Sequence, residues 1–172
     1  RPAVSAKLAP FGTTIFTTMS RLAAEHGAVN LSQGFPDFEG PAFVKEAAAR
    51  ALHHEHNQYA PMPGLPALRA RIAERFTRDT ALACDPDAQV VVTAGCTEAI
   101  AAALLGVCDP GDEVVLFEPY YDSYRACVAM AGASARFVTM RGPGFMFDPA
   151  ELRKAVTART RMIVVNTPHN PT

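Results

Sequence analysis

The sequence predicts an α/β protein with a mostly parallel central sheet. In its second half, short β-rich runs alternate with helical stretches, an order typical of parallel strands joined by helices. The predicted strands are QVVVT, EVVLF, ARFVTM and MIVVN, at 89–93, 113–117, 135–140 and 162–166. The predicted helices between them cover 97–107, 122–131 and 149–157. A chain of 172 residues is long enough for one domain with a real core.

The N-terminal segment predicts an arm and a first helix. The first ten residues include two prolines and are expected to be extended. A helix is predicted to start after Thr13 or Thr14, because either side chain can cap it, and to end at Gly27. Val29 and Leu31 predict a short strand over 29–31.

Two further helices are predicted over 42–56 and 65–78, each after a loop rich in glycine and proline. On the second of these, an apolar stripe is expected from Leu68, Ile72 and Phe76. The DPGD stretch at 109–112 has the proline and glycine positions of a type II turn. Asp148 with Glu151 resembles a capping box at the start of the last helix.

Composition excludes several classes of protein. With 16 basic and 17 acidic residues, the chain shows no charge excess for nucleic acid or an anionic membrane. It has no apolar run of the ~18 residues needed for a membrane span, and its start is unlike a signal peptide, so a cytoplasmic protein is expected. Its cysteines form no C-x-x-C pair, so reduced, mostly buried thiols are expected at Cys84, Cys96, Cys108 and Cys127.

Ligand sites in open α/β sheets lie at the carboxyl ends of strands, and the first such end is a candidate anion site. Strand 89–93 passes through small residues, Gly95 and Cys96, into a helix starting near Thr97. Helix N-termini favour anions, so this turn can cradle a phosphate. It is neither G-x-G-x-x-G nor a Walker A sequence. A tight strand-to-helix turn that needs no ligand fits the same residues.

Two more strand ends carry distinctive side chains. The FEPYYDSY stretch supplies aromatic rings that can stack on a flat ligand or pack in the core, namely Tyr120, Tyr121 and Tyr124. The NTPHNPT stretch supplies neutral hydrogen-bonding groups, or an Asx/Pro turn, from Asn166, His169 and Asn170. By contrast, HHEH at 53–56 lacks the H-E-x-x-H arrangement, and a solvated helix end without metal is expected there.

The order of these stretches is more specific than any one of them. The chain contains, in succession, GTTIFTTMS, VNLSQGFPDFEGP, NQYAPMPG, VVTAGCTEAI, DPGDEVVLFEPYYDSY, MAGA and NTPHNPT. Together they resemble the N-terminal half of a class I/II aminotransferase of pyridoxal 5'-phosphate (PLP) fold type I. The pattern is most similar to the branch of methionine, kynurenine (glutamine) and N-succinyldiaminopimelate aminotransferases.

The resemblance implies a three-layer PLP-transferase fold and a division into two parts. Residues 1–28 would be an N-terminal arm and helix on the small-domain side. Residues 29–172 would be the N-terminal part of the large PLP-binding domain, with its mostly parallel central sheet. The cofactor would be PLP, and no metal would be required.

The resemblance also implies where the cofactor's phosphate would bind. Its phosphate would lie against Gly95, Cys96 and Thr97, mainly on backbone N–H groups, although Cys96 replaces the smaller residue usual there. Tyr59 would reach the phosphate held by a partner subunit, which implies a homodimer.

The remaining implied contacts concern the cofactor ring and the substrate. Tyr121 would stack on the pyridine ring, and Asn170 would bond its phenolic oxygen and lie beside the substrate. The backbone of Gly34 would lie by the substrate carboxylate.

The resemblance places the Schiff-base lysine of the family downstream of this chain. Lys7, Lys45 and Lys154 are expected to be solvated surface residues. The chain is therefore expected to be a fragment, inactive alone, of a protein that transfers an amino group from an amino acid to a 2-oxo acid. Methionine, aromatic or glutamine-like donors are favoured by the branch. A cysteine-S-conjugate β-lyase and a non-catalytic regulatory module of the same fold stay as alternatives.

Overall fold

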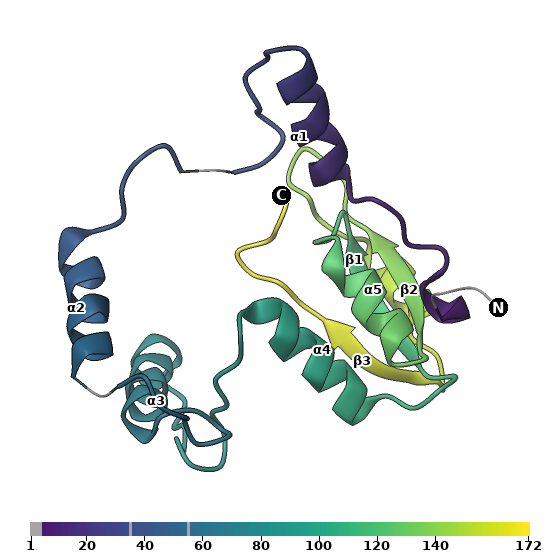
Figure 1. Cartoon of the computed structure of the whole chain (residues 1–172). Helices are drawn as coiled ribbons and strands as arrows, with labels where there is room; N and C mark the ends of the chain where they lie inside the picture. Colours follow the sequence, from purple (N-terminus) through teal and green to yellow (C-terminus); the bar gives the residue numbers. More distant parts are fainter. Residues whose placement is uncertain (1–4, 35, 55) are drawn as a thin grey trace. The chain divides into compact units, whose positions relative to one another are not determined.

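The computed structural model describes residues 5–34, 36–54 and 56–172, which form two compact units (Figure 1). One unit combines the arm up to Thr13 with Ala94–Thr172, and the other is Thr14–Thr93. The predicted boundary between 28 and 29 concerns the domains of the whole protein and stays a prediction.

The first unit contains a parallel sheet, as predicted. Its strands are β1 (Glu113–Glu118), β2 (Ser134–Thr139) and β3 (Thr160–Val164), in the order β2-β1-β3. Its helices are α4 (Cys96–Val107), α5 (Ser123–Met130) and α6 (Pro149–Ala155). All six elements were predicted from the alternation of β-rich and helical stretches, with bounds within a few residues.

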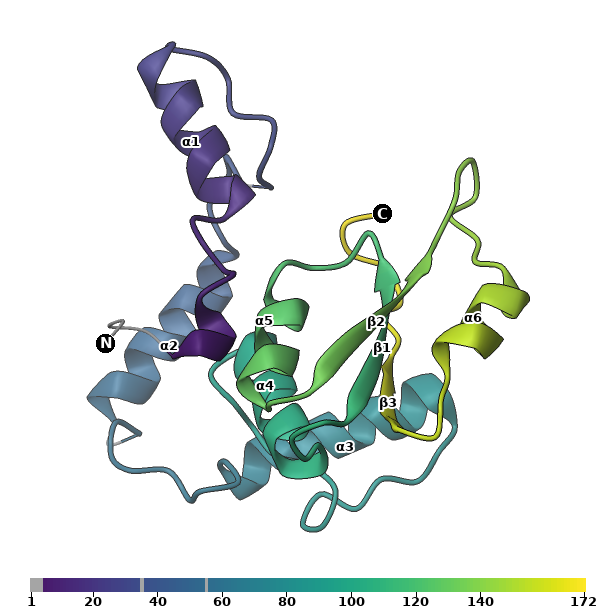
Figure 2. The ribbon, with the colours of Figure 1, turned by 90° about the vertical axis from the view of Figure 1, so that its right-hand side faces the viewer.

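Helices cover both faces of this sheet, so the unit has three layers (Figure 2). On one face, α4 and α5 pack on β1 through a buried cluster that includes Leu104, Leu116 and Val128. On the other face, α6 packs through Ala155 against Val115 and Val138. Strand β1 lies at the centre, and four of its residues are buried.

Local signals fix several ends of these elements. Gly111 has φ +98° in the turn before β1, as the predicted type II turn requires. Asp148 caps α6, because its Oδ1 accepts a hydrogen bond from Ala150 N at 2.7 Å. The expected capping box is only half formed, since Glu151 pairs with Arg141 at 2.8 Å.

The N-terminal arm is attached to α5. It is not extended throughout, because Ala6–Leu8 form a short 3₁₀ helix, η1. Lys7 Nζ donates a hydrogen bond to Met130 O at 2.6 Å, where the last carbonyls of α5 need partners. The Arg125 guanidinium lies 5.4 Å from the centre of the Phe11 ring. Lys7 therefore stabilises the end of α5 in addition to being exposed.

The second unit contains the three predicted N-terminal helices. They are α1 (Ile15–Glu25), α2 (Ala42–His53) and α3 (Pro66–Thr80). Thr14 is the cap of α1, and its Oγ1 accepts a hydrogen bond from Thr17 N at 3.3 Å. Helix α2 ends earlier than predicted, and position 55 of the HHEH stretch lies outside the described residues.

Two predicted strands, at 29–31 and 89–93, are wrong. The structure assigns neither segment to a strand, and Val29, Leu31 and Val91 are exposed. A strand needs a neighbouring strand for its hydrogen bonds, and apolar content alone does not provide one. Val92 instead donates a hydrogen bond to Pro63 O at 2.9 Å, in a loop-to-loop contact.

That loop contact depends on a glycine. Gly64 has φ +104°, and a Cβ at this position would lie 2.6 Å from Val92 Cγ2. A side chain at residue 64 would therefore be strained by the backbone and would also collide with Val92. Nearby, Arg69 is buried and binds Asp87 at 3.0 Å and Pro86 O at 2.8 Å.

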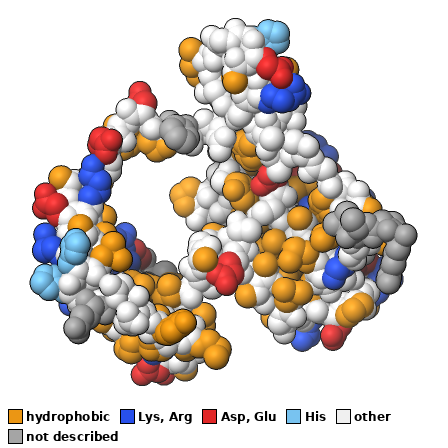
Figure 3. All heavy atoms as spheres, in the orientation of Figure 1, with side chains coloured by type: hydrophobic (Ala, Val, Ile, Leu, Met, Phe, Trp, Pro, Cys, Tyr) orange, Lys and Arg blue, Asp and Glu red, His pale blue; other side chains and the backbone are white. Residues whose placement is uncertain are grey.

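The predicted apolar stripe on α3 is not buried. Leu68, Ile72 and Phe76 all stay at least 40% exposed, whereas Ala73 is buried. Figure 3 shows apolar side chains gathered on the surface around this helix. The period of the stripe was correct, but within the described residues no element of its unit packs over it.

Burial of the cysteines is also lower than expected. All four are free, but only Cys108 and Cys127 are buried. Burial raises the pKa of both thiols, so they stay protonated at neutral pH.

Among the described residues, no helix is both long and apolar enough to cross a membrane.

Candidate functional site

One pocket of about 390 Å³ in the first unit brings together the three stretches that the sequence placed at strand ends. It lies where β1 and β3 end and α4 begins, the position at which α/β sheets hold ligands. Its lining consists of Ala94, Gly95, Cys96, Thr97, Ile100, Tyr121, Tyr124, Asn166 and Asn170. Five residues predicted for a site therefore share this pocket: Gly95, Cys96, Thr97, Tyr121 and Asn170.

The N-terminus of α4 forms one wall. Gly95 precedes the helix with φ +87°, a conformation that side chains rarely adopt, and no atom lies within 4 Å of where its Cβ would be. The Glu98 carboxylate accepts a hydrogen bond from Ala94 N, which holds the turn against the helix. The first N–H groups of a helix have no partner within it, and the helix dipole adds positive potential there. This wall suits an anion.

Tyrosines form a second wall. The rings of Tyr121 and Tyr124 meet edge to face with centroids 6.0 Å apart, and Tyr124 N donates to Tyr121 O at 3.1 Å. Burial raises the pKa of the Tyr124 hydroxyl, and Cys96 and Tyr121 raise it further. Tyr124 is therefore neutral at physiological pH. Tyr120 follows the packing alternative, since it stacks on Phe137 at 5.5 Å and does not line the pocket.

The loop after β3 completes the pocket with two amides. Asn166 and Asn170 both line it and offer donors and acceptors that do not titrate. His169 does not line it, and its Nδ1 lies 2.7 Å from Thr172 Oγ1. The pocket thus combines an anion-binding end, aromatic rings and neutral polar groups, which suits a flat, polar, anionic ligand.

The other two predicted site residues, Gly34 and Tyr59, belong to the second unit. Both are exposed, and the Tyr59 side chain is fully so. Their roles stay predictions. Within the ranges that the structure describes, no group of three potential ligands could hold a metal ion, including the described histidines of 53–56.

Comparison with known proteins gives the family. Residues 26–172 match the model of aminotransferase class I and II. The chain belongs to this family. The probable N-succinyldiaminopimelate aminotransferase DapC of Mycobacterium tuberculosis is 51% identical over 168 residues, and this alignment covers 96% of the chain and 42% of the relative. The methionine aminotransferase of Escherichia coli is 46% identical, and its alignment covers 96% of the chain and 43% of the relative.

A solved structure gives the same result for the fold. The N-succinyldiaminopimelate aminotransferase from Mycobacterium tuberculosis matches with a TM-score of 0.92 at 50% identity, over 99% of the chain and 45% of that structure. The fold is therefore the N-terminal part of PLP fold type I, as the sequence resemblance implied. The chain spans less than half the length of these aminotransferases.

Four lining residues had no predicted contact with cofactor or substrate: Ala94, Ile100, Tyr124 and Asn166. Tyr124 and Asn166 were nevertheless candidates from the sequence, because each lies in a stretch at the end of a predicted strand. A signal existed for Tyr124, because it belongs to the same FEPYYDSY stretch as Tyr121. Asn166 is the last residue of the predicted strand 162–166, and this position at a strand end is also a signal for a site residue. No sequence signal separates Ile100 from other apolar residues of α4.

Proposed function

We propose that the intact protein is a PLP-dependent aminotransferase and that this chain supplies the phosphate end, one ring face and one polar edge of its cofactor site. The observation that carries the proposal is the pocket that joins the start of α4, Tyr121 and Asn170. Membership in the aminotransferase family supports it independently.

The residues present fit the phosphate of PLP. Gly95 leaves open space where a Cβ would be, so a phosphate can approach the backbone at the start of α4. The N–H groups of Cys96 and Thr97 are in the first helical turn, and the Thr97 hydroxyl adds a donor. The Cys96 thiol is exposed, so its size does not close the pocket.

The residues also fit the pyridine ring. Tyr121 can lie against its face, and an offset aromatic contact of this kind contributes about 0.5–1.5 kcal/mol. Asn170 can donate a hydrogen bond to the phenolic oxygen without changing charge itself. When bound, PLP supplies an electron sink for the carbanion formed at the amino acid's Cα. This chain's residues would hold the ring flat, anchor its phosphate and set the polarity at its edge.

The proposed substrates are an amino acid and a 2-oxo acid. The names of the relatives support methionine or N-succinyldiaminopimelate-type substrates for those proteins. For this protein we propose a methionine, aromatic or glutamine-like donor, with the backbone of Gly34 beside the substrate carboxylate. Gly34 has open space around it, so a ligand could approach its backbone.

We also propose a homodimer in which Tyr59 reaches the phosphate bound by the partner. Its fully exposed side chain supports this, because a large aromatic side chain usually gains from a covered surface. In this arrangement, residues 1–28 belong to the small-domain side and 29–172 to the large domain.

The test is amino-group transfer by the intact, cofactor-loaded protein. Methionine, phenylalanine and glutamine are each offered with 2-oxoglutarate, and the expected result is glutamate with the matching 2-oxo acid. Pyruvate released from a cysteine S-conjugate without glutamate would favour the β-lyase. Neither product from any donor, despite bound cofactor, would favour the regulatory module.

A further inference from the structure

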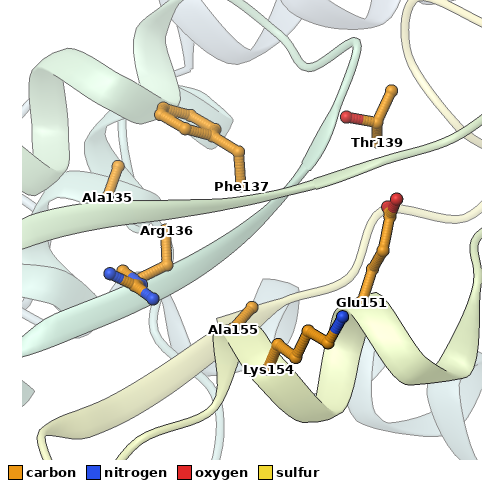
Figure 4. A pocket seen from close by; sticks show the side chains of 7 residues that line it. All are labelled: Ala135, Arg136, Phe137, Thr139, Glu151, Lys154 and Ala155. Atoms are coloured by element: carbon orange, nitrogen blue, oxygen red, sulfur yellow. The ribbon is translucent and has the colours of Figure 1, made fainter.

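We propose that the open edge of β2 binds an extended acidic peptide, which adds to the sheet as a further strand. This edge forms part of a groove of about 470 Å³ between β2 and α6 (Figure 4). The groove is separate in residues from the pocket at the carboxyl ends of β1 and β3. Its lining is Ala135, Arg136, Phe137, Thr139, Glu151, Lys154 and Ala155.

Backbone pairing shows which groups of β2 face outward. Strand β2 pairs only with β1 in the described sheet, and Ser134 N and Met140 N donate to Asp112 O and Glu118 O. Along a parallel strand, alternate residues bond to the same neighbour. The N–H and C=O groups of Ala135, Phe137 and Thr139 therefore point away from β1.

One end of this edge is already closed. The Glu151 carboxylate accepts a backbone hydrogen bond from Thr139, and Arg141 Nη1 donates to Thr139 O at 3.3 Å. The outward N–H and C=O groups of Ala135 and Phe137 have no hydrogen-bond partner among residues 5–34, 36–54 and 56–172, which the structure describes. Edge strands with free backbone groups are templates for strand pairing, and here the template is short.

The two faces of β2 differ in chemistry. Phe137 extends on one side of β2 and is 42% exposed, whereas Arg136 extends on the other side, where Lys154 rises from α6 (Figure 4). Successive side chains of an added strand alternate between such sides. A peptide with alternating apolar and charged residues would therefore place its apolar side chains by Phe137.

The charges of the groove favour carboxylates on that peptide. Glu151 is compensated by Arg141 at 2.8 Å, so it adds little net negative charge. Arg136 lies 3.9 Å from Glu113, but that carboxylate already has a closer partner in Arg159 at 2.5 Å. Arg136 and Lys154 are both exposed, which leaves a cationic surplus along the groove.

The experiment measures fluorescence anisotropy of a labelled, capped hexapeptide of alternating valine and glutamate with the full polypeptide that contains this chain. The matched peptide has lysine in place of glutamate. Ala135→Pro removes one outward N–H and leaves the bonds to β1 intact. Lys154→Glu reverses one groove charge, and Arg153→Glu is its control on the same helix outside the groove.

We expect saturable binding of the glutamate peptide only. Ala135→Pro or Lys154→Glu should weaken this binding about tenfold, because each removes a backbone or charged hydrogen bond to the peptide. Arg153→Glu should leave the binding unchanged. Circular dichroism verifies that each variant is folded. The proposal is overturned by equal binding of the lysine peptide, or by binding that ignores both groove variants. No binding at all, as when the polypeptide's own segment or a second copy covers the edge, overturns it too.

Discussion

The Glu113 carboxylate accepts a hydrogen bond from Arg159 Nη2 at 2.5 Å, which joins the start of β1 to the segment before β3. It accepts a second bond from Thr157 Oγ1 at 2.7 Å. The Glu113 side chain is only 4% exposed. A buried carboxylate is tolerated when it is paired and hydrogen-bonded, and these two bonds meet that condition.

The pH dependence of stability should reflect this carboxylate. The bond from Thr157, followed by that from Arg159, lowers the pKa of Glu113 in the folded protein. A lowered pKa stabilises the fold above the unfolded carboxyl's pKa of about 4.3, and this stability is lost as pH falls through the folded value. At pH 7, Glu113→Gln should therefore unfold at a lower urea concentration than the parent protein. Near pH 3 the difference between the two midpoints should be smaller. An equal difference at both pH values would contradict this role.

Two adjacent leucines of α4 should contribute very differently to the free energy of unfolding. Leu104 is 1% exposed in the cluster between α4, α5 and β1, whereas Leu105 is 54% exposed. Leu104→Ala should lower the free energy of unfolding by about 2–5 kcal/mol because it leaves a cavity. Leu105→Ala is the matched control and should change it by about 0.5 kcal/mol or less. Similar losses in urea unfolding would mean that this face of the sheet is not the core.

Gly64 should resist substitution by alanine. Its φ of +104° and the 2.6 Å approach to Val92 both oppose a Cβ, so Gly64→Ala should cost about 1–3 kcal/mol. Gly40→Ala is the control, because a Cβ there meets no atom within 4 Å. Thermal unfolding of both variants gives the comparison. A Gly64→Ala protein as stable as Gly40→Ala would show that the contact with Val92 is not needed.

Tyr121 should affect cofactor affinity through its ring. In the intact protein, Tyr121→Ala should weaken PLP binding about two- to tenfold, the range expected for one aromatic contact. Tyr121→Phe keeps the ring and should bind nearly as well as the parent. The measurement is the dissociation constant from a titration with PLP followed by absorbance. A larger loss in Tyr121→Phe than in Tyr121→Ala would assign the contact to the hydroxyl.

The sequence predicted those elements that carry strong local signals. Strand β1 contains a continuous apolar run that follows the turn at 109–112, and α1 has a capping threonine and a terminal glycine, so both appeared with nearly correct bounds. The segments at 29–31 and 89–93 are also rich in apolar residues, yet they form no strand. Whether such a segment becomes a strand depends on a neighbouring strand, which is not a local property of the sequence.

The candidate site was predictable for a similar reason. Tyr121 and Asn170 follow β1 and β3, two parallel strands whose carboxyl ends meet at one edge, and both line the pocket. Gly95 lines it as the residue before α4, although the strand predicted at 89–93 is absent. The sequence could not rank the neighbouring tyrosines, because the choice between Tyr120 and Tyr124 depends on the packing of Phe137. Gly34 and Tyr59 lie in the other unit, so their roles stay predictions.

The most direct test of the proposed cofactor site is the absorbance of the intact protein incubated with excess PLP and then freed of unbound cofactor. We expect a visible band of bound cofactor that borohydride removes, and a weaker band when Asn170→Ala and Tyr121→Ala are combined. A protein that retains no PLP absorbance after this treatment, while remaining folded by circular dichroism, would contradict the proposed cofactor site.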